Sequence, residues 1–254
     1  MTTATPTASR RPGTVAVHSV DRFVFAVPDL AVAQKFYATF GLDVRQSAGP
    51  SGNRLDLYTF GNPHCWASVF KAGDRKQLQF VRYGIFADDE AVFRERVATA
   101  GIGIAAHPLS SGMDGNQGIW LRDPDGTADL IAFIHTPHGS DHHLVAFAKS
   151  HAPGLHHSSW DVGSADEVGS GMEQMRIAGW GKGWGVGRHV LGSNFFNYVE
   201  DPWGSFCEYS AGIDFIPADL DWPAADHPPE DSMYVWGPTL PENFITNQEQ
   251  PRPA

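Results

Sequence analysis

The chain has 254 residues, of which 42% are hydrophobic and 19% charged, as in an ordinary folded globular protein rather than a disordered or fibrous one. Its formal net charge of -11 argues against nucleic acid or an anionic membrane surface as a partner. Two cysteines are too few for a disulfide framework, so we expect reduced thiols and a cytoplasmic protein.

The first segment, residues 1–16, is polar, and we expect it to be a flexible tail. Its two arginines are not followed by the apolar run of a signal peptide. No later run approaches the roughly 18 apolar residues of a membrane span. We therefore predict no membrane partner.

One unit then recurs along the chain: a short apolar strand, a helix start marked by Asp or Ser, an amphipathic helix, and a glycine at the helix stop. Its three copies are Phe23–Leu42, Val81–Ile102 and His157–Trp180. Repetition at this scale is typical of one supersecondary unit used several times.

Two strand pairs joined by DPxG turns follow the second and third copies: WLRDPDGTADLIAF (120–133) and NYVEDPWGSFCEY (197–209). Each pair is predicted to form a β-hairpin, which makes the unit βαβββ. Paired units would contribute curved half-sheets that enclose a cup. We predict an α+β fold built from such modules, with cupped mixed sheets.

The last segment, residues 217–254, is rich in Pro, Asp and Glu but carries Trp222, Tyr234, Trp236 and Phe244. Those aromatic residues favour an irregular segment packed on the body of the protein.

Two residues in the last third could bind a metal. In GLHHSSWDV (154–162) the side chains alternate, so only one histidine of the pair His156 and His157 can face the cup. Alone, a strand histidine is more often a half-buried, hydrogen-bonded side chain. Glu208 stands in the apolar run FCEY, where a carboxylate is costly unless it is paired or binds a metal.

The run GRHVLGSNFFNYVEDPWGSFCEY (187–209) contains a histidine, a tyrosine nine residues later, the turn DPWG, and a glutamate four residues after its glycine. Together with the repeated unit it resembles the vicinal oxygen chelate superfamily, and specifically the type I extradiol dioxygenases that open catechol rings. The modular resemblance covers about residues 17–212 and its specific part about 135–212. Asn197 departs from the pattern, because an apolar residue usually precedes the tyrosine.

The resemblance implies His157 and Glu208 as metal ligands and Fe(2+) as the metal, with Mn(2+) as the alternative. It implies His143, fourteen residues before His157, as an acid-base residue, for which a near-neutral pKa would suit both tasks. It also implies that His189 and Tyr198 hydrogen-bond the substrate. The implied reactants are a small aromatic diol and O2, and we expect a homo-oligomer. Trp184, Phe195 and Phe196 could wall the pocket or serve only as core.

The second histidine ligand that the resemblance requires cannot be found. It belongs on the opening strand of a third module, but counting back from His143 leads into the helix of the second module. We therefore predict that the third module is truncated, through loss of about 45–50 residues near Ala128. His107, His135, His138 or His143 itself remain as candidates for the missing ligand.

The predicted organisation is thus a two-module structural domain over residues 17–134 and a catalytic-type domain over 135–216, with a partial third and a complete fourth module. We predict an Fe(2+)-dependent extradiol dioxygenase, active or impaired by the lost ligand. The alternatives are a non-catalytic small-molecule binder of the same superfamily and another metal-dependent chemistry of it, such as isomerisation.

Overall fold

A computed structural model describes residues 10–49, 52–105, 118–122, 131–247 and 249. Two five-stranded sheets form its body. The first has the order β2-β3-β4-β1-β5 and the second the order β14-β10-β11-β12-β9. The strands of the first sheet are β1 (Ser19–Val27), β2 (Asp43–Gly49), β3 (Gly52–Tyr58), β4 (Ala67–Lys71) and β5 (Gln77–Gly84). Those of the second are β9 (His157–Asp161), β10 (Gly183–His189), β11 (Phe195–Glu200), β12 (Phe206–Ala211) and β14 (Tyr234–Trp236).

The two sheets repeat one topology. A helix follows the opening strand in each, α1 (Leu30–Phe40) after β1 and α3 (Ala165–Ile177) after β9. The fourth strand of each unit then returns parallel to the first, β4 beside β1 and β12 beside β9. This confirms the α+β fold with mixed sheets, and the hairpin expected around DPWG forms between β11 and β12.

Helix α1 begins and ends where the sequence predicts. The Asp29 carboxylate accepts hydrogen bonds from the backbone N–H groups of Ala31 and Val32, which have no partner inside the helix. Gly41 ends it with φ of 104°, a conformation that a side chain would make costly. The Ser164 hydroxyl caps α3 in the same way, by accepting from the backbone N–H of Glu167.

The second unit differs from the prediction. Its opening strand β5 joins the first sheet, and α2 (Glu90–Thr99) follows the single turn η1 (Ala87–Asp89). Most of the hairpin expected over 120–133 lies outside the described residues. Its last strand, β6 (Ile131–Ile134), pairs instead with β8 (Val145–Ala148). A second small sheet joins β7 (Ser140–Asp141) to β13 (Phe215–Ile216).

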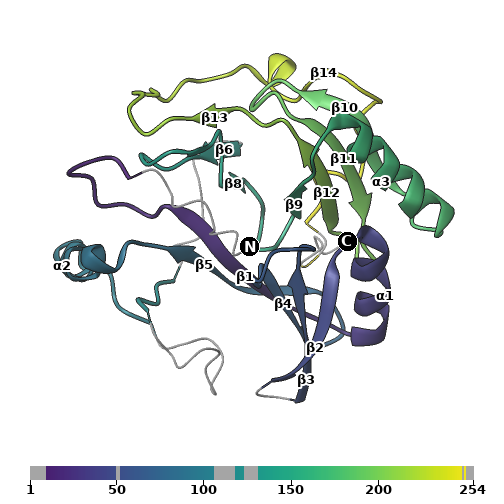
Figure 1. Ribbon diagram of the computed structural model, residues 1–254, viewed down its shortest axis with the longest axis horizontal. Helices are drawn as coiled ribbons and strands as arrows, with labels where there is room; N and C mark the ends of the chain where they lie inside the picture. The colour runs from purple at the N-terminus through teal and green to yellow at the C-terminus, as the bar shows by residue number, and fades with distance from the viewer. Residues whose placement is uncertain (1–9, 50–51, 106–117, 123–130, 248, 250–254) are drawn as a thin grey trace.

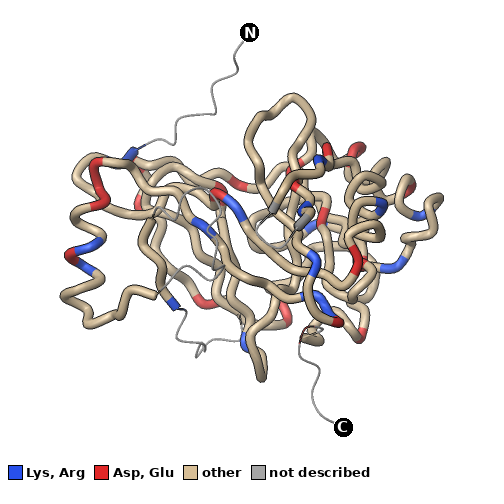
Figure 2. Tube along the Cα trace, turned by 90° about the horizontal axis from the view of Figure 1, so that it is seen from below, with Lys and Arg blue, Asp and Glu red and all other residues tan. Residues whose placement is uncertain are grey.

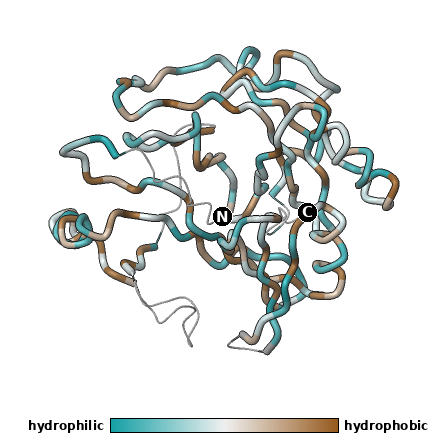
Figure 3. Tube along the Cα trace, in the orientation of Figure 1, coloured by the Kyte–Doolittle hydropathy of each residue, from teal (hydrophilic) through white to brown (hydrophobic). Residues whose placement is uncertain are grey.

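The two large sheets share one apolar core. Helices α1 and α3 lie side by side on one flank (Figure 1), and the Phe40 and Tyr209 rings stack between them at 3.9 Å. The Tyr209 hydroxyl donates to the carbonyl of Phe40 over 2.7 Å, and one buried cluster continues from Phe25 and Phe36 to Trp160 and Met175. Both hydrophobic and hydrophilic residues occur along the strands that enclose this core (Figure 3). The two repeats therefore pack as one body.

A buried ion pair also joins the sheets. The Lys76 ammonium, just before β5, contacts the Asp201 carboxylate at the end of β11, and both side chains are nearly inaccessible, at 3% and 0% exposure. The second Asp201 oxygen accepts from the backbone N–H groups of Trp203 and Ser205, which shapes the DPWG turn. Charges of both signs are otherwise scattered along the chain (Figure 2).

The chain ends pack on the body at several points. Residues 1–9 lie outside the described residues, whereas Arg10 and Arg11, which the prediction places in the tail, form ion pairs with Asp88 and Asp221. The segment after β13 is mostly irregular, with one turn η3 (Pro229–Asp231) before β14, and it buries Phe244. Of the helices described, none is both long and apolar enough to cross a membrane.

Candidate functional site

The candidate site lies on the inner face of the second sheet, where β9 and β12 run parallel. In this register His157 lies opposite Phe206, and Glu208 lies opposite Ser159. The His157 Nε2 and Glu208 Oε2 atoms are 3.6 Å apart, and only 3% of Glu208 is exposed. Because side chains alternate along β12, Cys207 and Tyr209 turn the other way, into the core shared with the helices. The two predicted metal ligands are thus brought together.

Tyr198 and His189 complete the face. Tyr198 is the direct cross-strand partner of Glu208. His189 ends β10, and its Nε2 lies 3.0 Å from the Tyr198 hydroxyl and 3.7 Å from Glu208 Oε1. A register shift between Gly185 and Gly187 inserts one extra residue into β10. In a regular strand Trp184 and His189, five residues apart, would lie on opposite faces. The extra residue brings them to the same face, where their ring centroids are 5.7 Å apart.

The apolar walls are partly those expected. Trp184 and Phe196 pack with Tyr198 and Phe206 in a second buried cluster, capped by Phe244 from the C-terminal segment. Phe195 lies on the opposite face of β11, against the shared core and under the Arg188 guanidinium. It therefore does not line the site.

Sequence analysis missed two groups of residues around Glu208. Asn194, in the turn before β11, donates from Nδ2 to Glu208 Oε1 over 3.3 Å and to the Ser210 hydroxyl over 2.9 Å. Its amide oxygen is buried with no hydrogen-bond partner among the residues that the structure describes. The other group comprises the main-chain carbonyls of Met233 and Phe244, which contact His189 and His156. Every residue has a main-chain carbonyl, so the sequence does not show that these two contact histidines.

These carbonyls fix where the histidine protons lie, because a carbonyl can only accept. His189 Nδ1 is 2.7 Å from the Met233 carbonyl, so in the neutral ring Nδ1 carries the proton and Nε2 presents a lone pair. His156 Nε2 likewise donates to the Phe244 carbonyl, so its Nδ1 accepts from His157 Nδ1, 2.7 Å away. The Nε2 of His157 is then also a bare lone pair, and it faces Glu208.

The electrostatics of this cluster call for a cation. Burial, followed by the neighbouring His156, His143 and His189, holds the pKa of His157 well below its usual value, so its lone pair stays free at neutral pH. In the described part of the chain the ion-pair contacts of Glu208 are with His157 and His189 alone. Burial and the Glu208 charge raise the pKa of Tyr198 well above its usual value. A buried carboxylate facing two lone pairs is costly without a positive charge between them.

A divalent metal ion would supply that charge, and imidazole nitrogens with one carboxylate are a donor set that suits iron or manganese. Each imidazole has its other nitrogen hydrogen-bonded, as metal-binding histidines do. The residues therefore fit a metal. Across the described ranges, however, no three His, Cys, Asp or Glu side chains already surround a point that an ion could occupy.

His143 lies beside this cluster, in the loop between β7 and β8. Its ring contacts Phe133, and its Nδ1 is 3.2 Å from His142 Nδ1. Burial, and then the neighbouring His142 and His189, lower the pKa of His143 to about 4. The expectation of a near-neutral pKa was therefore wrong, because the sequence does not show how deeply this loop histidine is buried. At neutral pH the His143 ring is therefore uncharged.

Of the other histidines considered as ligands, His107 lies outside the described residues. His138 is fully buried elsewhere, with its ring against Phe86 and its Nδ1 accepting from the backbone N–H of Arg11. The ring of His135 contacts the carbonyl of Thr136 through Nδ1. None of the described contacts brings His135 or His138 to Glu208.

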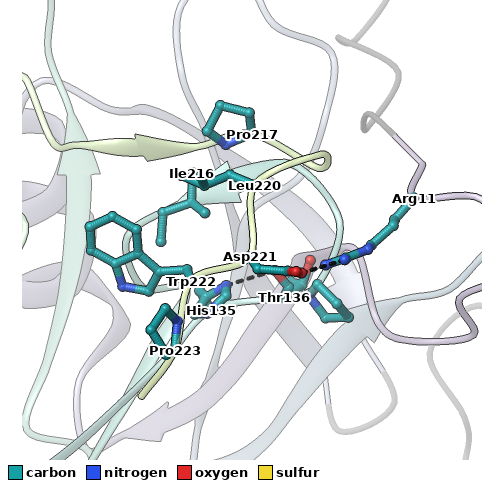
Figure 4. Close-up of a pocket in the computed structure, with 10 residues that line it drawn as sticks. Arg11, His135, Thr136, Ile216, Pro217, Leu220, Asp221, Trp222 and Pro223 are labelled. Carbon is teal, nitrogen blue, oxygen red and sulfur yellow. Dashed lines mark hydrogen bonds and ion pairs between the residues drawn. The ribbon is translucent and has the colours of Figure 1, made fainter. Parts of the chain in front are cut away.

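A surface cavity of about 650 Å³ lies between the N-terminal and C-terminal segments (Figure 4). Its walls include the Arg11–Asp221 ion pair, His135 and Trp222. The Trp222 ring contacts the His142 ring with centroids 6.1 Å apart, and His142 Nδ1 in turn lies 3.2 Å from His143 Nδ1. Of the residues considered for catalysis or metal binding, His135 lines this cavity, whereas His143, His157, His189, Tyr198 and Glu208 do not.

The chain matches no protein-family model. It is 38% identical to metapyrocatechase 2 of Cupriavidus necator over 307 residues, covering 92% of this chain and 93% of that relative. That alignment is longer than the 254-residue chain, so it must leave gaps in this chain.

Solved structures show the same fold at low identity. An extradiol ring-cleaving dioxygenase from B. fuscum has a TM-score of 0.72 at 16% identity, covering 94% of this chain and 85% of that one. BphC, a halotolerant catechol dioxygenase, has 0.70 at 16%, with 87% and 94% covered. The Mn(II)-bound glyoxalase of Novosphingobium aromaticivorans has 0.68 at 20%, with 91% and 94% covered.

Proposed function

The chain belongs to the family of extradiol catechol dioxygenases that have the vicinal oxygen chelate fold, and on that premise we propose that it inserts O2 into the ring of a small aromatic diol. The observation that supports this most directly is the buried carboxylate of Glu208, faced by two imidazole lone pairs on one sheet. We propose Fe(2+) as the metal, with Mn(2+) as the alternative.

The proposed roles follow from the contacts. His157 and Glu208 would hold the metal, and a bound metal would supply one centre for both reactants, the diol and O2. His143, which burial keeps uncharged at neutral pH by lowering its pKa to about 4, offers a lone pair that can accept a hydrogen bond from a substrate hydroxyl. The raised pKa of Tyr198 keeps its phenol protonated. Because Tyr198 lies opposite Glu208 on β11, its hydroxyl can donate a hydrogen bond to a substrate bound beside Glu208.

The apolar neighbours exclude water from this reaction. Trp184, Phe196 and Phe206 are buried around Tyr198, and Phe244 closes the cluster from the C-terminal segment. The exclusion of water strengthens the hydrogen bonds of His189 and Tyr198, and the apolar side chains favour a flat aromatic substrate.

We propose further that the third module has lost its opening strand and helix, and with them one metal ligand. The gaps that the alignment must leave in this chain support this, as does the pairing of β6 with β8 in a sheet that has two strands among the described residues. The division into domains at residues 134 and 135, the homo-oligomer and the cytoplasmic location stay predictions.

The test is anaerobic reconstitution with Fe(2+) followed by catechol, 2,3-dihydroxybiphenyl and air, with the yellow ring-fission product as the readout. We expect product from the wild-type chain and none from Glu208→Gln, which keeps the shape of the side chain but removes its charge. No product and no bound iron in the wild-type chain would contradict the proposal. Ligand binding unaffected by chelators would then favour the second candidate, a non-catalytic binder, which the absence of a ready-made three-ligand cluster in the described residues supports.

A further inference from the structure

The C-terminal segment contacts the site through its main chain as well as through its side chains. We propose that this segment positions His157: the Phe244 carbonyl, acting through His156, determines which nitrogen of His157 carries the proton, and Glu249 anchors the segment. His156 and Glu249 are thus positioning residues, which act through His157. The inference rests on the proposed function, in which the Nε2 lone pair of His157 binds the metal.

Two arrangements of protons are open to Phe244, His156 and His157. In the first, His156 donates from Nε2 to the Phe244 carbonyl and accepts at Nδ1 from His157 Nδ1, 2.7 Å away, which leaves a lone pair on His157 Nε2. In the second, each ring carries its proton on the other nitrogen. His157 Nε2 then bears a proton that the Glu208 carboxylate would attract. The Phe244 carbonyl and the Glu208 carboxylate therefore compete for opposite arrangements.

The contacts favour the first arrangement. The second would turn the lone pair of His156 Nε2 toward the lone pairs of the Phe244 carbonyl, which lies within hydrogen-bond distance. The second arrangement would gain little in return, because His157 Nε2 and Glu208 Oε2 are 3.6 Å apart, too far for an ordinary hydrogen bond. The Phe244 carbonyl therefore outweighs Glu208 in placing the proton of His157.

Packing holds both partners of this hydrogen bond in place. The buried Phe244 ring lies edge-on to the His156 and Tyr198 rings, with centroids 4.7 and 4.9 Å away. The backbone N–H of Phe206, at the start of β12, donates to the His156 carbonyl over 3.0 Å. His156 is therefore held by β12 through its main chain and by the C-terminal segment through its ring.

Glu249 anchors the C-terminal segment next to His156. It is buried, and its Oε1 accepts from the backbone N–H groups of Leu155 over 3.1 Å and of Leu78 over 2.9 Å. Leu155 directly precedes His156, and Leu78 lies in β5 of the first sheet. One carboxylate thus ties the segment both to the first sheet and to the residue before His156.

Asn247 adds a second attachment. Its Nδ2 donates to the carbonyl of Ala152 over 2.7 Å, and its Oδ1 accepts from the backbone N–H of Glu249 over 3.1 Å. A methyl group on Gly154 would lie 2.6 Å from that Oδ1, so a side chain at this position would displace Asn247. The C-terminal segment is therefore closely fitted to the chain just before β9.

The test reads the ring protons directly, by proton–nitrogen NMR correlation spectra of the full-length, metal-free chain with isotope-labelled histidine at neutral pH. We expect the Nδ1–H form of His157 in the wild-type chain and the Nε2–H form in His156→Leu, where Glu208 alone attracts the proton. His156→Asn should restore the Nδ1–H form, because the asparagine Oδ1 replaces the imidazole Nδ1 as acceptor. Affinity for Co(2+) should fall about 10–100-fold in His156→Leu and recover in His156→Asn.

Matched variants test the anchor. Glu249→Ala should show both forms of His157, because the segment is held less firmly, whereas Glu249→Gln keeps an acceptor oxygen and should match the wild-type chain. Glu242→Ala, at an exposed position of the same segment, should also match it. His138, whose Nδ1 accepts from the backbone N–H of Arg11, should keep its Nε2–H form in every variant and so report an intact fold.

The Nε2–H form of His157 in the wild-type chain, or its Nδ1–H form in His156→Leu, would overturn the role of His156. An unchanged His157 signal in Glu249→Ala would overturn the role of Glu249. Neither result depends on catalysis. A wild-type chain with the Nδ1–H form but with neither bound iron nor ring-fission product would contradict the proposed function and support the positioning role.

Discussion

We expect the ion pair of Lys76 and Asp201 to contribute strongly to the stability of the packing between the two sheets. Lys76→Met would leave the Asp201 carboxylate buried with two backbone N–H donors but no cation. Asp201→Asn would leave the Lys76 ammonium buried over the Phe25 ring, 4.9 Å from its centroid. Breaking a buried ion pair lowers the free energy of unfolding by about 3–5 kcal/mol. Because each remaining charge keeps other contacts, we expect a loss of about 3 kcal/mol for each single variant.

For a domain of this size such a loss lowers the melting temperature by roughly 6–12 °C. The assay is urea unfolding followed by tryptophan fluorescence, for both single variants and the double variant. The double variant should be much less destabilised than the sum of the singles, because it leaves no unpaired charge. The exposed pair of Glu173 and Arg176 on α3 serves as the control, and Arg176→Ala should not move the midpoint. Additive effects under about 1 kcal/mol for each buried partner would refute the reasoning.

Three further predictions concern packing and pH. In α3, Gly169→Ala should raise stability by about 0.5–1 kcal/mol, because its new methyl meets no atom within 4 Å. Gly171→Ala should instead lower stability by about 1–3 kcal/mol, because its methyl would lie 2.7 Å from the Tyr209 ring, and equal effects at the two glycines would contradict this. Tyr209→Phe should cost about 1–2 kcal/mol through the unpaired carbonyl of Phe40, measured by the same urea assay. His143 binds its proton more weakly in the folded than in the unfolded chain, so the free energy of unfolding should fall as the pH drops from 6.5 toward 4. His143→Gln should reduce that fall by about 3 kcal/mol. The same pH profile in the variant and the wild-type chain would count against the burial of His143.

The sequence predicted most of what depends on local patterns. Asp29 and Gly41 mark the ends of α1, and the turn DPWG marks the hairpin that holds Glu208. The histidine at the start of β9, His157, lies beside Glu208 as expected, and the spacing from His189 to Tyr198 puts both of these beside Glu208 too. These features need only neighbours in sequence or a fixed strand register.

What the sequence could not predict depends on segments that meet only in the folded chain. The carbonyls of Met233 and Phe244 set the protons of His189 and His156, but any residue could provide a carbonyl. The pKa of His143 follows from burial, which its sequence context does not reveal. The bulge in β10 left one recognisable sign, the glycines of GWGVG, which could have warned that parity changes along that strand.

The core shared by α1 and α3 bears on how this chain tolerates changes in length. The stacking of Phe40 on Tyr209 and the joint at Lys76 tie the first repeat directly to the last. The middle of the chain adds one strand to the first sheet and otherwise forms sheets of two strands within the described residues. Insertions and deletions between α2 and β9 should therefore leave the packing of the two large sheets unchanged, whereas the same changes near α1 or α3 would separate the repeats. Such a chain can therefore change the length of its middle while keeping one architecture.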